Sequence, residues 1–150
     1  LPLVYNCSGY ESEEVIEILD GVIDIYMPDV KFSSEIISEK FCQAKDYFEN
    51  LKKVLKIMHK QVGDLIIENG IAQRGLLIRH LVMPNGLAGT EELMEFIAKE
   101  ISKDTYINIM EQYRPCGEAY KFPEINRKIT FEEYEKAKEI ARSFGLYRFD

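Results

Sequence analysis

The chain has 150 residues, of which 46% are hydrophobic, 30% charged and 11% aromatic, and this balance excludes a disordered chain. The length suits a single domain, residues 1–150, with a buried core. The formal net charge of −7 disfavours nucleic acid as a partner, and no apolar run reaches the roughly 18 residues of a membrane-spanning helix, so no membrane partner is expected either.

The amino terminus opens directly on apolar residues, Leu1–Tyr5, without an initiator methionine or a signal segment. Within this stretch, Leu3–Tyr5 is predicted to be a buried strand. Because the chain begins in a strand, we expect it to be the rear part of a longer parent protein.

Four short runs rich in apolar and β-branched residues predict strands at Leu3–Tyr5, Val22–Met27, Leu76–Met83 and Tyr106–Met110. The runs are apolar on both faces, which is typical of parallel strands covered by helices. Segments with helical spacing separate them. The pattern therefore predicts a parallel sheet with right-handed helical crossovers.

The predicted helices are marked by their start signals, Ser12, Asp46, Thr90 and Thr130. Asp46 and Thr130 are each followed by a glutamate three residues later, which is the pattern of a capping box. The first helix is expected to turn Val15, Ile16 and Leu19 toward the core. The helix after Asp46 carries an apolar stripe at helical spacing, consisting of Tyr47, Leu51, Val54, Leu55 and Met58.

One segment, Asp64–Gln73, breaks the alternation of strands and helices. Its Asn69-Gly70 pair lies between apolar runs and predicts a β-hairpin, so a small antiparallel excursion is expected before the strand at Leu76. The segment Arg114–Ile129, with two prolines and a glycine, is predicted to be a long loop.

Together these elements predict an α/β fold of about four parallel βα units with a small β-hairpin insertion. The chain is too short for a closed eight-stranded barrel, which takes about 250 residues, so an open part of a TIM-like βα barrel fits better. A flat, doubly wound sheet is the structural alternative.

The three cysteines, Cys7, Cys42 and Cys116, are far apart in the sequence. An odd number without close spacing argues against a disulfide framework and favours a reducing, cytoplasmic compartment. It also argues against a local metal site, so each cysteine is expected to be an ordinary buried or half-buried residue.

Polar or ionisable residues follow every predicted strand, in the segments Asn6–Gly9, Pro28–Lys31, Met83–Gly86 and Glu111–Pro115. Parallel α/β folds place their sites at the carboxyl ends of the strands. These residues are therefore expected to meet at one rim of the sheet.

Asp29 and Lys31 are two residues apart on an extended segment and point to the same side. They could bind the two charges of an amino-acid-like group, or form an ion pair with each other. Arg79 and His80 must point to opposite faces of their strand. We expect Arg79 to point into the barrel and bind an anion, His80 to be a hydrogen-bonded core residue, and His59 to lie at the surface.

Several common nucleotide-binding, metalloprotease and serine-hydrolase motifs are absent. The glycine-rich turn Gly86–Thr90 before a predicted helix could cradle an anion. An unrelated phosphate-binding enzyme is therefore one alternative function. From these residues alone, the sequence predicts a part-barrel whose rim binds an anion or a zwitterion.

The strand ends resemble those of radical S-adenosylmethionine (SAM) proteins of the pyruvate formate-lyase activating enzyme branch. The resemblance lies in Val4–Ser12, Val22–Lys31, Gly75–Pro84, Tyr106–Pro115 and Glu124–Arg127, and covers essentially the whole chain in order.

This resemblance implies that the chain is the C-terminal part of a (βα)6 barrel whose first two strands, with a Cys-x-x-x-Cys-x-x-Cys loop for a [4Fe–4S] cluster, are not in this sequence. The parent is expected to cleave SAM reductively to a 5′-deoxyadenosyl radical that takes hydrogen from a protein glycine or an unknown substrate. Its partner would be a glycyl radical enzyme or a small molecule. The present chain alone is expected to be inactive.

The same resemblance implies a cofactor-binding set of Asn6, Ser8, Asp29, Lys31, Arg79 and Arg114. Lys31 would lie near the SAM carboxylate and Arg79 near SAM or the substrate. Asn6 stands where activating enzymes often have Asp, and Arg114 stands where they tend to have His. Because of these two differences, the resemblance does not identify the substrate.

A non-catalytic alternative is an interaction module. In that case exposed strand edges would be covered by a second copy of the chain.

Overall fold

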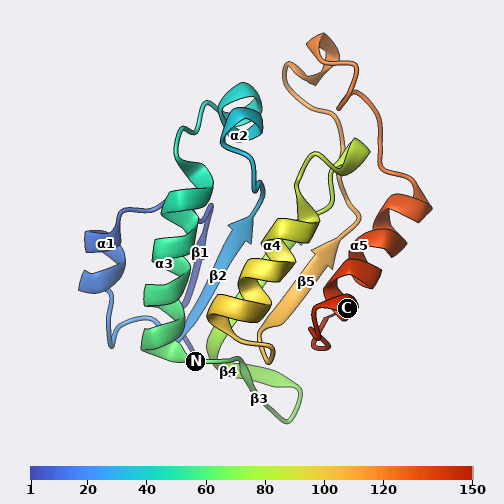
Figure 1. Cartoon of the computed structure of the whole chain (residues 1–150). Helices are drawn as coiled ribbons and strands as arrows, with labels where there is room; N and C mark the ends of the chain where they lie inside the picture. The colour runs from blue at the N-terminus through green and yellow to red at the C-terminus, as the bar shows by residue number, and fades with distance from the viewer. Residues whose placement is uncertain (150) are drawn as a thin grey trace.

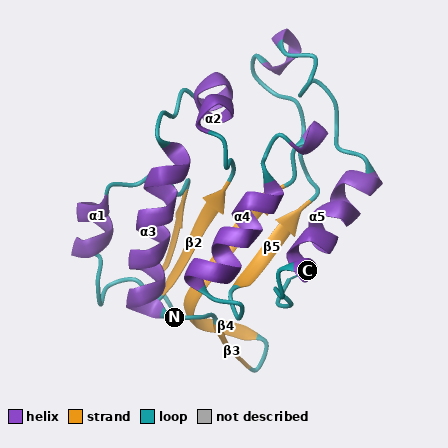
Figure 2. Ribbon diagram, in the orientation of Figure 1, coloured by secondary structure: helices purple, strands orange, loops and turns teal. Residues whose placement is uncertain are grey.

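The computed structural model describes residues 1–149, and its strands and helices alternate along the chain (Figures 1 and 2). The strands are β1 (Val4–Cys7), β2 (Ile25–Val30), β3 (Ile66–Glu68), β4 (Ile71–Leu81) and β5 (Tyr106–Met110). The helices are α1 (Glu13–Ile18), α2 (Glu35–Cys42), α3 (Tyr47–Val62), α4 (Thr90–Phe96), which continues into a π-helical turn at Ile97–Ile101, and α5 (Phe131–Ser143).

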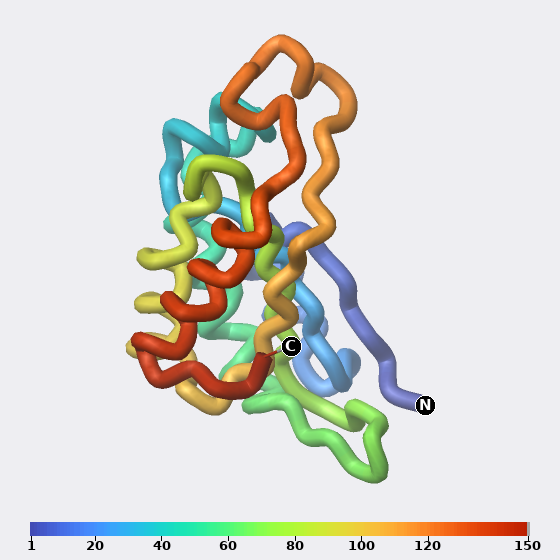
Figure 3. Tube along the Cα trace, turned by 90° about the vertical axis from the view of Figure 1, so that its right-hand side faces the viewer, coloured from blue at the N-terminus to red at the C-terminus, as the bar shows by residue number. Residues whose placement is uncertain are grey.

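The parallel strands lie side by side in the order in which they occur along the chain: β1 pairs with β2, β2 with β4 and β4 with β5. All the helices cover the same face of this sheet (Figures 1 and 3). A doubly wound sheet reverses its strand order and carries helices on both faces, so that alternative is wrong. The predicted α/β class with a parallel sheet is confirmed, and its one-sided layering is consistent with a partial βα barrel.

The first strand was expected to be buried, but Val4 is 51% exposed and Leu3 is 56% exposed. The β1 strand lies at the edge of the sheet and pairs only with β2 among the described residues. The second strand begins later than predicted, at Ile25, because pairing starts where the backbone amides of Asp24 and Ile25 donate to the Leu3 carbonyl.

The hairpin is confirmed, with Asn69 (φ 52°) and Gly70 (φ 78°) both in the left-handed region that a tight two-residue turn requires. The prediction placed a separate strand at Leu76 after the hairpin. In the structure, the second strand of the hairpin and the strand at Leu76 are one continuous strand, β4. At Gly75 (φ 124°), a Cβ atom would lie 2.5 Å from the backbone of Asp64 and Leu65. A glycine is therefore required where β4 changes partners.

The apolar stripe of α3 is confirmed, and all five of its predicted residues are buried. The cap expected at Asp46 is wrong, because that residue has φ 55° and makes no side-chain capping bond. The backbone amides of Phe48 and Glu49 instead donate to Oε1 of Glu35, 3.1 Å away. A carboxylate remote in sequence thus takes the place of the local cap.

Two other helix starts follow the prediction. Thr130 and Glu133 form a complete capping box at the start of α5, and the Ser12 side chain accepts from the Val15 amide at the start of α1. The inward orientation expected for Ile16 is confirmed, since it is fully buried, but that of Val15 is wrong, since Val15 is 44% exposed.

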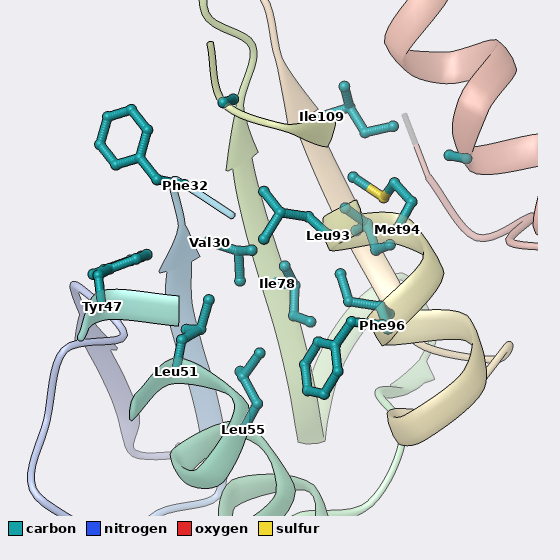
Figure 4. Packing of buried hydrophobic residues seen from close by; sticks show 14 of the residues in the cluster. Val30, Phe32, Tyr47, Leu51, Leu55, Ile78, Leu93, Met94, Phe96 and Ile109 are labelled. Carbon is teal, nitrogen blue, oxygen red and sulfur yellow. The ribbon is translucent and has the colours of Figure 1, made fainter. Parts of the chain in front are cut away.

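The core lies between the sheet and the helices (Figure 4). Val30, Ile78 and Ile109 point from the strands toward Leu51 of α3 and Leu93 of α4, and all of these residues are buried. The apolar residues of the strands therefore alternate with residues that face away from the helices. That second set forms the uncovered face of the sheet.

Candidate functional site

A row of polar side chains crosses the uncovered face near the carboxyl ends of the strands. In the strand register Asp29 of β2 pairs with Arg79 of β4, and Arg79 pairs with Asn108 of β5. The neighbours of these residues along each strand are buried against the helices, so the three side chains share the opposite face. Arg79 thus points away from the helices, as expected.

Asp29 is the centre of a three-residue charge cluster. Its Oδ1 accepts from Nε of Arg79 at 2.7 Å and lies 2.5 Å from Nη2, while its Oδ2 lies 3.6 Å from the Lys31 ammonium. The ion pair between Asp29 and Lys31 therefore exists, but Asp29 is shared. One carboxylate between two cations leaves the cluster with a surplus positive charge, which favours an anion.

The ends of β1 and β2 are held together by the hydroxyl of Tyr47 in α3. This oxygen lies 2.9 Å from the carbonyl of Asp29 and 3.1 Å from that of Ser8, and it accepts from the Lys31 amide at 3.1 Å. Burial raises the pKa of Tyr47, so the hydroxyl keeps its proton and acts as a donor. Sequence reasoning placed Tyr47 in the core but missed this role.

Gly9 allows this close approach of the two strand ends. A Cβ atom there would lie 2.7 Å from the Asp29 carbonyl oxygen and 2.6 Å from Cδ1 of Leu51, and the residue has φ 74°. Only glycine fits without displacing the backbone of Asp29.

The six predicted cofactor-binding residues do not all come together. Asp29, Lys31 and Arg79 form the charge cluster. Asn6 is exposed on β1, the Ser8 hydroxyl lies 3.4 Å from Glu11, and Arg114 is exposed in the loop after β5. In the part of the chain that the structure describes, no hydrogen bond or ion pair joins these last three side chains to the cluster.

Asn108 was missed in the sequence, although a signal was present. It is a polar residue inside a short apolar strand, between the buried Ile107 and Ile109. Together with Arg79, it lines a cavity of about 310 Å³ on the uncovered face. The β3–β4 hairpin contributes Ile67, Gly70 and Ala72 to the same cavity, so the hairpin bounds it at the amino end of the sheet (Figure 3).

The predicted role of His80 in the core is confirmed. Its ring is fully buried, with Nδ1 2.8 Å from the Val30 carbonyl and Nε2 3.0 Å from the Thr90 hydroxyl. A carbonyl can only accept, so Nδ1 carries the proton and Nε2 accepts from Thr90. Burial lowers the pKa of His80 to about 4. His59 is half-buried rather than on the surface, and its Nε2 lies 3.0 Å from Asp64.

The cysteines form no metal site. Cys7 is half-buried as expected, but Cys42 and Cys116 are exposed, because they lie on a short helix and in the long loop at the rim. Within residues 1–149, no group of three or more His, Cys, Asp or Glu side chains could hold a metal ion. The residues described here therefore do not fit an iron–sulfur cluster.

The glycine-rich turn is already filled by side chains. Gly89 has φ 69°, and a Cβ atom there would lie 1.8 Å from the hydroxyl oxygen of Ser33. The carboxylate of Glu92 lies 3.4 Å from the same hydroxyl. A carboxylate beside the turn repels phosphate, which argues against the phosphate-binding alternative.

Comparison with known proteins finds no matching family model. The chain is 37% identical over 147 residues to the "Uncharacterized protein MJ0674" of Methanocaldococcus jannaschii, a match that covers 97% of this chain and 39% of that protein. The chain thus spans about two fifths of the length of this relative.

Among solved structures, the fold is similar to that of a domain of pyruvate-formate lyase-activating enzyme from Bacteroides vulgatus. The TM-score is 0.65 at 12% identity, and the superposition covers 98% of this chain and 78% of that one. At this identity the likeness shows the fold alone. None of the helices described is long and apolar enough to cross a membrane.

Proposed function

We propose that this chain is the C-terminal part of a radical SAM iron–sulfur enzyme related to the activating proteins of glycyl radical enzymes. The observation that carries the proposal is the row of Asp29, Arg79 and Asn108 on the uncovered face, at the carboxyl ends of parallel strands. The one-sided sheet and the similarity to the activating-enzyme domain support it.

The cluster around Asp29 suits the amino-acid end of SAM. The Asp29 carboxylate can accept from an ammonium group, while Lys31 and Arg79 can pair with a carboxylate. The structure already holds these opposite charges within one cluster. A bound zwitterion brings one charge of each sign, so it would exchange existing ion pairs for new ones without changing the net charge of the cluster.

The iron–sulfur cluster would be held by another part of the longer parent protein, since the described residues offer no set of ligands for it. When bound in the parent protein, the reduced cluster would supply the electron for cleavage of SAM to methionine and a 5′-deoxyadenosyl radical, which would take hydrogen from a protein glycine or a small molecule. The residues of this chain position SAM and shield the uncovered face at its amino end with the hairpin.

The test is made on the full-length gene product, purified without oxygen and supplied with iron, sulfide, SAM and a reductant. We expect iron–sulfur absorbance and release of 5′-deoxyadenosine. Arg79→Gln is expected to weaken SAM binding about tenfold by removing a charge-assisted contact. Arg142→Gln on α5, away from the row, is the matched control and should bind SAM normally. The absence of both cluster and 5′-deoxyadenosine would refute the proposal.

A further inference from the structure

A second cavity, of about 670 Å³, lies at the carboxyl rim of the sheet. Its walls come from the ends of β2 and β4, from α2 and from the long loop that follows β5. Small-molecule sites typically measure about 300–1,000 Å³, so this cavity has the size of a ligand pocket. None of its residues except Lys31 belongs to the predicted cofactor-binding set.

Aromatic rings form much of the wall. Phe32, Phe41 and Phe122 all line the cavity, and the rings of Phe41 and Phe122 meet edge to face with their centroids 5.4 Å apart. The Lys40 ammonium lies 5.0 Å from the centroid of one of these rings and 5.3 Å from the other. These contacts fasten α2 to the loop, so the pocket has two supported sides.

Most of the charge around the cavity is already neutralised. The ammonium of Lys40 pairs with Glu124, and the carboxylate of Glu118 pairs with Lys121. Lys40 and Glu118 therefore leave no net charge at the cavity wall. A ligand would gain little by pairing with either of them.

Lys31 is the exception. Its only ion-pair partner in the described chain is Asp29, at 3.6 Å, and Asp29 is held more closely by Arg79. The side chain of Lys31 is also 36% exposed, and it lines the cavity. Lys31 therefore presents the surplus positive charge of the cluster to the cavity.

We infer that this cavity binds a small, mainly aromatic molecule with a single carboxylate, its ring against Phe41 and Phe122 and its carboxylate toward Lys31. The binding follows from the cavity alone. Its further identification as the substrate of the parent enzyme rests on the proposed function, with Arg79 then holding the carboxylate of SAM and Lys31 that of the substrate. An aromatic ring fits these walls, and one carboxylate matches the one unbalanced cation.

Three matched probes test the inference: 3-phenylpropionate, its neutral amide and 3-phenylpropylammonium, each titrated into the 150-residue chain and followed by NMR. We expect the carboxylate to bind about tenfold more tightly than the amide, and the cation most weakly. Lys31→Met should make the carboxylate and the amide equal, and Phe122→Ala should weaken both. Lys53→Met, on the outer side of α3, is the control and should change neither.

A second measurement needs no variant. Cys42 and Cys116 line the cavity, whereas Cys7 does not. Bound 3-phenylpropionate should therefore slow alkylation of the first two thiols by iodoacetamide and leave Cys7 unaffected. No binding at millimolar probe, equal binding of all three probes, or uniform protection of the three thiols would overturn the inference. Release of 5′-deoxyadenosine by the parent, measured separately, would still support the proposed function in that case.

Discussion

The buried His80 makes the stability of the fold depend on pH between neutrality and about pH 4. Its ring is fully buried, and burial lowers its pKa from the ordinary value of 6.5 to about 4. Between these two values the unfolded chain binds a proton that the folded chain does not. Stability supplied by the neutral ring is therefore present above pH 6.5 and is lost as the pH falls toward 4.

The size of the effect follows from the two pKa values. Because the pKa of His80 is about 4 in the folded chain and 6.5 in the unfolded chain, the free energy of unfolding should fall by about 2 kcal/mol between pH 7 and pH 4.5. The measurement is urea unfolding at a series of pH values, for the wild type and for His80→Gln, which does not titrate. The wild type should lose about 2 kcal/mol more than the variant over this range.

Ile78→Val is the matched control, because it shortens a neighbouring buried side chain on the same strand. It should lower the free energy of unfolding by about 1 kcal/mol at every pH and keep the wild-type pH dependence. Parallel pH profiles for the wild type and His80→Gln would refute the assignment of a neutral, buried His80.

Three further predictions concern the rim, β4 and the sheet edge. Tyr47→Phe should lower the free energy of unfolding by about 2 kcal/mol, because the Lys31 amide loses its acceptor; an unchanged urea midpoint would contradict this. Gly75→Ala should cost about 3 kcal/mol or more, because its Cβ meets the backbone before β3, and near-wild-type thermal unfolding would refute that reasoning. If the exposed edge of β1 pairs with a second copy, light scattering should show a dimer that Val4→Lys abolishes, and a wild-type monomer would exclude it.

Local patterns predicted much of the fold. The strand Tyr106–Met110, the hairpin turn at Asn69-Gly70 and the capping box at Thr130 all appear where the sequence placed them. Each depends on residues close together in the chain, whose backbone preferences and spacing act without a partner. The cap at Asp46 failed because Glu35, from a neighbouring helix, accepts the same amides.

The candidate site was predicted only in part. Asp29, Lys31 and Arg79 were singled out, but their sharing of one carboxylate depends on the register between β2 and β4. Asn108 joins the row for the same reason. Spacing along one strand shows which face a side chain takes, yet it does not show which residue of another strand lies beside it.

By itself, the sequence determined the alternation of strands and helices and the buried face of α3, because both follow from the period of hydrophobic residues. Only the tertiary structure decided between a one-sided and a doubly wound sheet, and only it showed that Tyr47 ties two strand ends together and that the rim encloses an aromatic cavity. These features arise from contacts between segments far apart in the chain, and such contacts are set by packing and strand register rather than by local preference.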